Sequence, residues 1–284
     1  MSESEIYGRW DLKVEHPQGE FPSWVEIKPD GGSFVGQVGS ARPITSVNVD
    51  GAKVRFSLPK QYEQRTTDLL FEGAVENGSL QGSCLSDSGE MVRFVGSRAP
   101  ALPKPDPVRW GEPIELIGSD LTNWTPRSPN WTNSWIIQNG QLVNTAVGSD
   151  LVTKDRFQDF KLVAEYSYPE GSNSGIYLRG RYELQILDDH GKQPTVGSSG
   201  AIYGFLVPSS NAAKAANEWN TMEITLLGRF VTVVLNGSTI IEDREIPGIT
   251  GGALDSDEGM PGPLFVQGDH GPVSFRRMTL TPAL

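Results

Sequence analysis

The sequence predicts an all-β protein of two domains, and three observations lead to this prediction. Its 284 residues include 32 glycines and 20 prolines, which terminate helices and form turns. Apolar residues mostly alternate with polar ones, as in half-buried strands, and the 3.6-residue period of an amphipathic helix is nearly absent. Four prolines between positions 99 and 107 exclude a sheet ladder there and indicate a stiff linker. We therefore divide the chain into residues 1–98, a linker at 99–111 and residues 112–284.

The first part predicts a small antiparallel barrel with a lipocalin-like meander of short strands. Turn dipeptides such as Asp50-Gly51 and Asn77-Gly78 separate several of the strands, and closure into a barrel would remove exposed sheet edges. The opening Gly8-Arg-Trp10 is similar to the Gly-x-Trp start of lipocalin-like barrels, although a core tryptophan in another β domain is an alternative. The candidate strands are residues 9–14, 23–27, 33–38, 44–49, 53–58, 68–75, 79–84 and 90–96.

The second part predicts a two-sheet sandwich of the jelly-roll type. Its strands alternate more clearly, and Asn139-Gly140 and Asn236-Gly237 are two-residue hairpin turns between pairs of them. Some ten short strands over about 175 residues are typical of a sandwich. The candidate strands are residues 135–138, 141–144, 160–168, 175–179, 182–187, 201–207, 220–227, 231–235, 238–242, 263–267 and 274–281.

Composition excludes several classes of function. Lys and Arg total 24 against 35 for Asp and Glu, a net charge of −11, which argues against nucleic-acid binding. The single cysteine, Cys84, excludes an intrachain disulfide and a Cys-based zinc site. No apolar run approaches the roughly 18 residues of a membrane span. The N-terminal residues lack the basic and apolar regions of a secretory signal, so we expect a cytoplasmic location, or a periplasmic one if the chain is trimmed.

Three predicted strands of the second part each have one apolar face and one face with large polar or aromatic groups. Alternation places Tyr177 and Arg179 on the second kind of face, together with Glu183 and Gln185 on the next strand and Gln267 on a later one. Planar bidentate groups can pair with vicinal hydroxyls, and an aromatic ring can cover a C–H face. The pattern is therefore a candidate sugar-binding surface, and an ordinary outer face with intrasheet ion pairs is the alternative.

Three loops carry groups that could perform chemistry. Asp188-Asp-His190 and Gln267-Gly-Asp-His-Gly-Pro272 follow polar strands, and Asp255-Ser-Asp-Glu-Gly259 is a short acidic run. A histidine beside a carboxylate can act as a general base or a metal ligand. The glycines that flank His270 could bring it close to a ligand, whereas a solvated turn is the alternative, favoured for the acidic run.

Several strings in the second part together resemble the bacterial 3-keto-disaccharide hydrolase family, over roughly residues 112–284. The strings are Ser172-Asn-Ser-Gly-Ile-Tyr-Leu-Arg-Gly-Arg-Tyr-Glu-Leu-Gln-Ile-Leu-Asp188, Gly200-Ala-Ile-Tyr-Gly204, Glu218-Trp-Asn220, Val234-Leu-Asn-Gly237, Thr250-Gly-Gly-Ala-Leu-Asp255 and Gly262-Pro-Leu-Phe-Val-Gln-Gly-Asp-His-Gly-Pro272. The resemblance implies a concanavalin-like, glucanase-like jelly roll. It does not extend to residues 1–98 and implies nothing about their role.

The resemblance implies cleavage of glycosides in which a glucose unit carries a ketone at C3. Such a substrate is a 3-keto-glucoside or an oxidised oligosaccharide. The ketone acidifies the C2–H, so that a base can remove this proton and the C1 substituent can leave by β-elimination. Addition of water then gives net hydrolysis. This chemistry needs a base near C2, an electrophile at the C3 oxygen and an acid near the leaving oxygen. A sugar 3-dehydrogenase acting upstream would supply the substrate.

The same resemblance assigns candidate roles to residues. His270 is the candidate base, Glu183 the candidate acid/base, and Asp188 a third catalytic candidate. A divalent metal (Ca, Mn or Zn) is the cofactor that the family allows, with Glu183 and His270 as candidate ligands. The candidates for substrate binding are Tyr177, Arg179, Gln185, Tyr203 and Gln267. A non-catalytic, lectin-like carbohydrate-binding module on the same fold and an interaction protein with a vestigial site are the alternatives.

Overall fold

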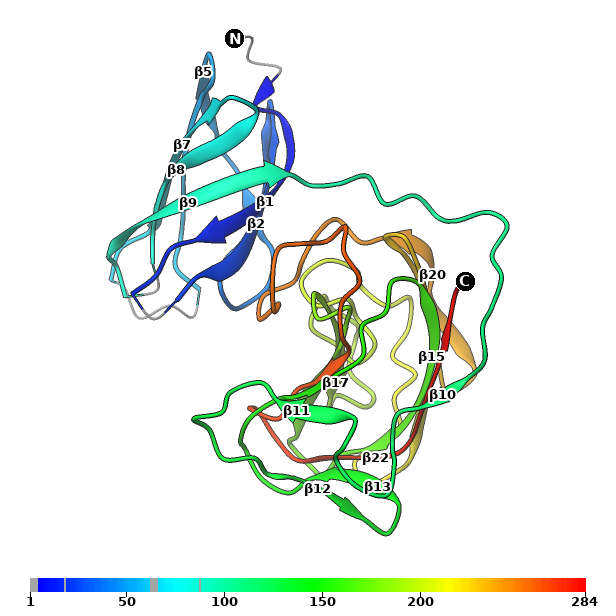
Figure 1. Ribbon diagram of the computed structural model, residues 1–284. Coiled ribbons are helices and arrows are strands. Elements are labelled where there is room, and N and C mark those ends of the chain that lie inside the picture. Colours follow the sequence, from blue (N-terminus) through cyan, green and yellow to red (C-terminus); the bar gives the residue numbers. More distant parts are fainter. Residues whose placement is uncertain (1–4, 18, 62–65, 87) are drawn as a thin grey trace. The chain divides into compact units, whose positions relative to one another are not determined.

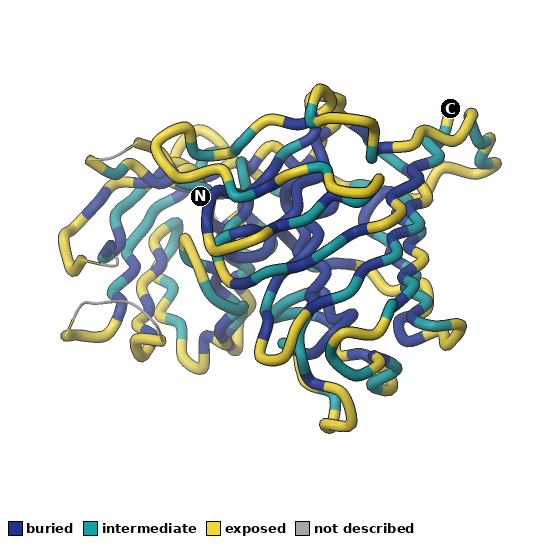
Figure 2. Tube along the Cα trace, turned by 90° about the horizontal axis from the view of Figure 1, so that it is seen from below, coloured by how far each residue is buried: buried dark blue, intermediate teal, exposed yellow. Residues whose placement is uncertain are grey.

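The computed structural model describes residues 5–17, 19–61, 66–86 and 88–284, and the regular elements among them are all β-strands (Figure 1). The all-β prediction is therefore confirmed. None of these residues forms a helix long and apolar enough to cross a membrane. Contacts divide the chain into two compact units, one of Met1–Ala101 with Gly248–Gly259 and one of Leu102–Pro247 with Met260–Leu284. In both, exposed loops connect strands that carry the buried residues (Figure 2).

The first unit is one antiparallel nine-stranded sheet whose neighbour order is β4-β3-β2-β1-β9-β8-β7-β6-β5. Among the described residues no ladder joins β4 to β5, so closure into a barrel stays a prediction. Its strands are β1 (Gly8–Val14), β2 (Phe21–Lys28), β3 (Gly31–Val35), β4 (Arg42–Ile44), β5 (Asn48–Asp50), β6 (Lys53–Leu58), β7 (Leu69–Glu76), β8 (Ser79–Leu85) and β9 (Met91–Arg98).

Aromatic side chains fill the core of the first unit. Phe71 is fully buried and stacks on Phe56 and Phe94, each at a centroid distance of 4.5 Å. Trp10 is also fully buried, and its indole N–H donates to the Ile6 carbonyl. The Arg98 guanidinium lies 3.8 Å from the Trp10 ring centroid, a cation–π contact that anchors the tryptophan of the Gly-x-Trp motif.

A segment from the second half of the sequence, Gly248–Gly259, belongs to the first unit. The Gly252 amide donates to the Gln37 carbonyl at 2.9 Å, and the Ser256 hydroxyl donates to the Leu12 carbonyl at 2.5 Å. Asp257, in the acidic run, pairs with Lys13 at 3.2 Å. The acidic run is therefore held within the first unit as part of this segment.

Part of the proline-rich stretch that follows β9 is bound to the second unit. Its residues from Leu102 onward belong to the second unit, where the Leu102 carbonyl accepts the Arg229 amide at 3.1 Å. Lys104 pairs with Asp243 at 2.7 Å. The stretch predicted to be a linker is thus divided between the two units.

The second unit consists of two antiparallel sheets, as the sandwich prediction requires. The eight-stranded sheet has the order β12-β13-β22-β15-β18-β19-β20, with β10 also paired to β22, and the five-stranded sheet has the order β11-β14-β21-β16-β17. The larger sheet comprises β10 (Ile114–Glu115), β12 (Trp135–Gln138), β13 (Gln141–Asn144), β15 (Phe160–Ser167), β18 (Asn220–Leu227), β19 (Phe230–Leu235), β20 (Ser238–Glu245) and β22 (Val273–Pro282). The smaller sheet comprises β11 (Trp124–Pro126), β14 (Leu151–Thr153), β16 (Asn173–Leu178), β17 (Tyr182–Leu187) and β21 (Phe265–Val266).

The strand predicted at residues 201–207 is replaced by isolated bridges. Ile202 pairs with Leu184 of β17 and with Leu206 of its own segment. Gly200 and Gly204 have positive φ angles of 78° and 76°, which turn the backbone out of an extended strand. The segment therefore borders β17 without extending the sheet regularly.

Candidate functional site

The two faces of the five-stranded sheet differ in chemistry. Ile176 lies opposite Leu184, and both are fully buried, as expected of a core face. Tyr177 lies opposite Glu183 on one side and Phe265 on the other, so these three share the second face, called here the site face. The predicted alternation is confirmed for these strands.

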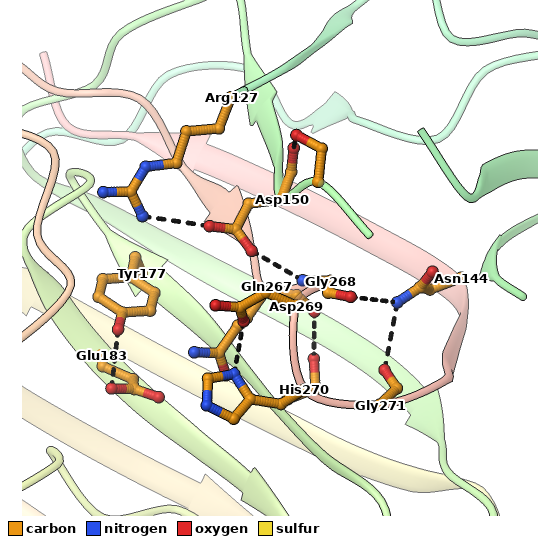
Figure 3. A network of polar contacts seen from close by, with 12 residues as sticks. Arg127, Asn144, Asp150, Tyr177, Glu183, Gln267, Gly268, Asp269, His270 and Gly271 are labelled. Carbon is orange, nitrogen blue, oxygen red and sulfur yellow. Dashed lines mark hydrogen bonds and ion pairs between the residues drawn. The ribbon is translucent and has the colours of Figure 1, made fainter. Parts of the chain in front are cut away.

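Glu183 is a buried carboxyl group held by Tyr177 (Figure 3). The Tyr177 hydroxyl donates to Glu183 Oε2 at 2.9 Å, and only 5% of Glu183 is exposed. Burial raises the pKa of Glu183 to about 8, against the opposing effects of the Tyr177 hydrogen bond and of His270. Glu183 is therefore protonated at neutral pH and can act as a proton donor.

Two neighbours fix the geometry around Glu183. The Tyr177 ring stacks on Phe265 with centroids 3.8 Å apart, which sets the direction of its hydroxyl. Gly175 lies beside the carboxyl group, and a Cβ there would come within 3.0 Å of Glu183 Oε1. A side chain at position 175 would therefore press against Glu183 and displace its carboxyl group.

His270 is joined to Asp269 in the loop after β21 and lies near Glu183 (Figure 3). Its Nδ1 is 2.5 Å from Asp269 Oδ1, and 48% of its side chain is exposed. The hydrogen bond to Asp269 is the largest cause that raises the pKa of His270 above its usual 6.5, and the charge of Glu183 adds to it. If Nδ1–H donates to Asp269, Nε2 is the acceptor of the neutral ring and can take a proton from a ligand.

Asp150 and Arg127 support this loop from the neighbouring strands. Asp150 is buried, and its Oδ1 accepts the Gly268 amide at 2.9 Å while its Oδ2 accepts Arg127 Nη1 at 3.1 Å. Burial is the main cause that raises the pKa of Asp150. Neither residue was predicted from the sequence. The available signal was weak: Asp150 directly precedes the apolar start of a short strand.

Two buried oxygen acceptors near the site have no partner among the described residues. Gln267 is 8% exposed, and its Oε1 accepts no hydrogen bond, nor does Asn173 Oδ1 on β16. The backbone of Gln267 is fixed, since its amide donates to the Gly175 carbonyl at 2.9 Å. A buried acceptor without a donor is costly, and a ligand hydroxyl would satisfy it.

The expectation that Arg179 shares the site face is wrong. Arg179 follows the last residue of β16 and has a φ of 52°, so the turn breaks the alternation. Its fully buried guanidinium donates to the Gly228 carbonyl at 2.6 Å and to the Tyr182 hydroxyl at 3.3 Å. Tyr182 and Glu183 are adjacent on β17 and point to opposite faces. Arg179 therefore braces the turns and does not reach the ligand surface.

The remaining candidates have mixed outcomes. Asp188 Oδ2 accepts the Gly171 amide at 2.8 Å, a turn-stabilising role that argues against catalysis by Asp188. Gln185 lies opposite Gly175 and is buried, but its Oε1 accepts the neighbouring Ile186 amide at 3.1 Å. Tyr203 is half-buried beside β17, where its amide donates to the Glu183 carbonyl at 2.9 Å. Tyr203 thus remains a candidate for contact with a ligand.

The two candidate metal ligands do not form a complete donor set. Within the part of the chain that the structure describes, no three His, Cys, Asp or Glu side chains are grouped to hold a metal ion. Glu183 Oε2 and His270 Nδ1 are engaged by Tyr177 and Asp269, and catalytic zinc normally has three protein ligands. These residues do not by themselves fit a divalent metal, and a metal requirement stays a prediction.

The site face of this β-sandwich carries a protonated carboxyl group, Glu183, and the loop beside it carries His270, a candidate base. Buried oxygens without a donor could accept hydrogen bonds from sugar hydroxyls. A glycoside-cleaving enzyme needs groups of these kinds. The family model of the 3-keto-alpha-glucoside-1,2-lyase-like domain matches residues 112–281, and the chain belongs to this family. The resemblance seen in the sequence is confirmed. Membership supports a carbohydrate-active enzyme that acts on glycosides.

The solved structures to which the chain is similar include two candidate glycosyl hydrolases from Parabacteroides distasonis ATCC 8503. One is 25% identical to this chain with a TM-score of 0.47, and the match covers 60% of this chain and 98% of the solved chain. The other is 26% identical, with a TM-score of 0.47, covering 63% and 92%. A carbohydrate-binding module from Bacillus subtilis is 12% identical, with a TM-score of 0.38, covering 55% and 94%. No curated protein matches the chain.

Proposed function

We propose that the second unit cleaves 3-keto-glucosides by β-elimination followed by hydration, which amounts to net hydrolysis. The observation that supports this most is the pairing, on one sheet face, of a carboxyl group protonated at neutral pH with a histidine oriented by aspartate. Glu183 and His270 influence each other's pKa, as expected of groups that can act on one bound molecule. Family membership adds the 3-keto substrate class to the proposal.

In the first step, His270 Nε2 takes the proton from C2, and the electron pair moves toward the C3 ketone oxygen. The C1–O bond then breaks as the C1–C2 double bond forms and the ketone is restored. Glu183 gives its proton to the departing oxygen, which leaves as an alcohol. Asp269 stabilises the imidazolium that His270 becomes. The products of this step are an enone and the free aglycone.

In the second step the two groups exchange roles, as microscopic reversibility allows. The Glu183 carboxylate takes a proton from water while the oxygen of that water adds to C1 of the enone. The exposed His270 imidazolium exchanges its proton with the solvent between the two steps and then gives a proton to C2. The sum is 3-keto-glucoside plus water giving 3-keto-glucose plus alcohol, with both residues restored. No second carboxylate at a glycosidase spacing is needed, because the ketone and not an oxocarbenium ion carries the developing charge.

Gln267 and Tyr203 are proposed to hold the sugar. The unpaired Gln267 Oε1 would accept a sugar hydroxyl, and the amide N–H of the same side chain can donate to the C3 oxygen. Tyr203 would cover a C–H face or donate from its hydroxyl. The substrate would come from a reaction that oxidises the C3 hydroxyl of a glucoside, the class of a sugar 3-dehydrogenase.

The pH dependence of kcat/KM should be bell-shaped and narrow. The base form of His270 is required, so the rate should rise as the pH passes through the His270 pKa, which lies above 6.5. The acid form of Glu183 is required, so the rate should fall as the pH passes about 8. A stopped assay in buffers of constant ionic strength measures both limbs. A rate that keeps rising through the alkaline range would contradict the role of Glu183 as the acid.

Gly175→Ala should lower kcat/KM by about 10- to 100-fold, the usual effect of displacing a catalytic group. The new Cβ would lie 3.0 Å from Glu183 Oε1 and 3.2 Å from its Cγ, so the carboxyl group must move. Gly118→Ala is the control, since nothing lies within 3.7 Å of a Cβ there and the nearest atom, Asp120 O, is 3.8 Å away. Equal losses in the two variants would show that Glu183 is not the affected group.

Aglycone release tests the proposed function itself. The protein would be incubated with a 3-keto-glucoside and with the same glucoside before oxidation, each with and without chelator. The proposal predicts release from the keto form only. Retention of the keto-sugar without release, with divalent metal supplied, would instead identify a carbohydrate-binding module. Loss of release with chelator would show that a metal is required.

A further inference from the structure

We infer that Asn144 is a positioning residue that holds the pair of Asp269 and His270 in place. This inference rests on the proposed function, in which His270 is the base. Asn144 ends β13 in the eight-stranded sheet, whereas His270 follows β21 of the other sheet. Residues 267–272 (the histidine loop) connect β21 to β22, and Asn144 pairs with Val273, the first residue of β22. Asn144 therefore braces the loop from the strand beside its end.

The contacts of Asn144 are specific to its amide group (Figure 3). Its Nδ2 donates to the Gly268 carbonyl and to the Gly271 carbonyl, each at 3.2 Å. These carbonyls lie on either side of Asp269 and His270 in the sequence. Because both partners are acceptors, the contacting group must be a double donor, which fixes the orientation of the amide. Asn144 is 1% exposed, so water cannot readily replace it.

Other side chains hold three further backbone groups of the histidine loop. The Ser174 hydroxyl donates to the Gln267 carbonyl at 2.8 Å, and the Ser172 hydroxyl donates to the Pro272 carbonyl at 2.5 Å. The Gly268 amide is bound by Asp150. The ends of the loop are thus anchored separately, and Asn144 braces the turn between them, where the catalytic pair projects.

Removal of the two Asn144 donors would leave the Gly271 carbonyl without its side-chain donor, while the Gly268 carbonyl would keep the Gly148 amide, which donates to it at 2.9 Å. A buried carbonyl without a partner costs free energy, so the loop would shift toward water. His270 would move with it, since Asp269 and His270 directly precede Gly271 in the loop. A small displacement of a base from the proton it removes slows proton transfer much more than it weakens binding.

Asn144→Asp is the sharpest variant, because it keeps the shape and replaces both N–H donors by an oxygen. We expect kcat to fall about 10- to 100-fold with KM changed less than about threefold. The isotope effect with C2-deuterated substrate should rise, because proton abstraction becomes more limiting. A loss of folded protein alone would leave that isotope effect unchanged. Asn133→Asp is the matched control: Asn133 Oδ1 accepts the Trp135 amide at 3.1 Å, and aspartate keeps this acceptor.

Hydrogen exchange of the Gly268 and Gly271 amides gives a readout that needs no activity. We expect faster exchange in Asn144→Asp, by about tenfold or more, with parental exchange in Asn133→Asp. Asn144→Ala should behave like Asn144→Asp and replaces it if the aspartate variant does not fold. Parental exchange or a parental isotope effect in the Asn144 variants would overturn the inference. A parent that never cleaves the keto-sugar would refute the proposed function, while exchange alone would still decide the role of Asn144.

Discussion

Replacing His270 with alanine should lower turnover of a 3-keto-glucoside by about 10²- to 10⁴-fold, the usual contribution of a positioned general base. The proton moves only in the transition state, so KM should change little. The pair of His270 and Asp269 makes the effect large, because Asp269 orients the ring and stabilises its charged form. Steady-state kinetics with a glucoside that bears a chromogenic aglycone measures the loss.

His190→Ala provides the matched control. His190 is exposed, and its Nδ1 lies 2.6 Å from the Ala213 carbonyl, outside the site face. We expect this variant to retain parental turnover. Near-normal turnover in His270→Ala, measured beside that control, would remove His270 from the mechanism. An increase in KM alone, with turnover unchanged, would instead make His270 a binding residue.

Glu183→Gln should produce a loss that depends on the leaving group. The amide keeps the shape of the carboxyl group and can still accept from the Tyr177 hydroxyl, but it carries no acidic proton. A sugar leaving group needs that proton, so we expect a loss of about 10²- to 10⁴-fold. A nitrophenolate leaves without protonation, so the loss with a nitrophenyl aglycone should be much smaller. Kinetics with both substrates separates the two cases.

Asp188→Asn is the control for Glu183→Gln. Asp188 accepts the Gly171 amide, and asparagine keeps an oxygen that can do the same. Turnover should stay parental with both leaving groups. Equal losses for the two aglycones in Glu183→Gln would mean that Glu183 serves in a different step. The alkaline limb of the pH profile should also disappear in Glu183→Gln, because that limb is assigned to the ionisation of Glu183.

The site face was predictable because strand alternation is a local property. Tyr177 and Glu183 lie on sequential strands of a hairpin, and their parity alone places them together once the hairpin forms. The same argument placed Phe265 and Gln267 beside them. What parity could not predict was burial, and burial raises the pKa of Glu183 and makes it an acid.

Alternation failed where the strand ended. Arg179 is one residue beyond β16, and its positive φ directs the side chain to Tyr182 and Gly228. Residues with a positive φ are usually glycine or asparagine, so an arginine at this position did not indicate a turn. The position of a strand end is the least reliable part of a sequence interpretation, and here it decided whether Arg179 met the ligand surface.

The sequence could not predict which distant side chains support the histidine loop. Asn144 and Asp150 lie more than a hundred positions before Gly268, and their contacts depend on the pairing of β13 with β22 and of β14 with β21. Segment Gly248–Gly259 raised the same difficulty, since its string resembled the family yet it packs in the first unit. Such contacts follow from topology, which local patterns do not encode.

Deuterium incorporation tests the central claim, removal of the C2 proton, most directly. Cleavage of a 3-keto-glucoside would be run in heavy water, and the released 3-keto-sugar would be analysed by mass spectrometry and NMR. Preformed product incubated with the protein under the same conditions corrects for exchange after release. Elimination followed by hydration predicts deuterium at C2 in the product of each cleavage, beyond that correction. Release of a product that retains its original C2 proton would show direct displacement at C1 and contradict the mechanism.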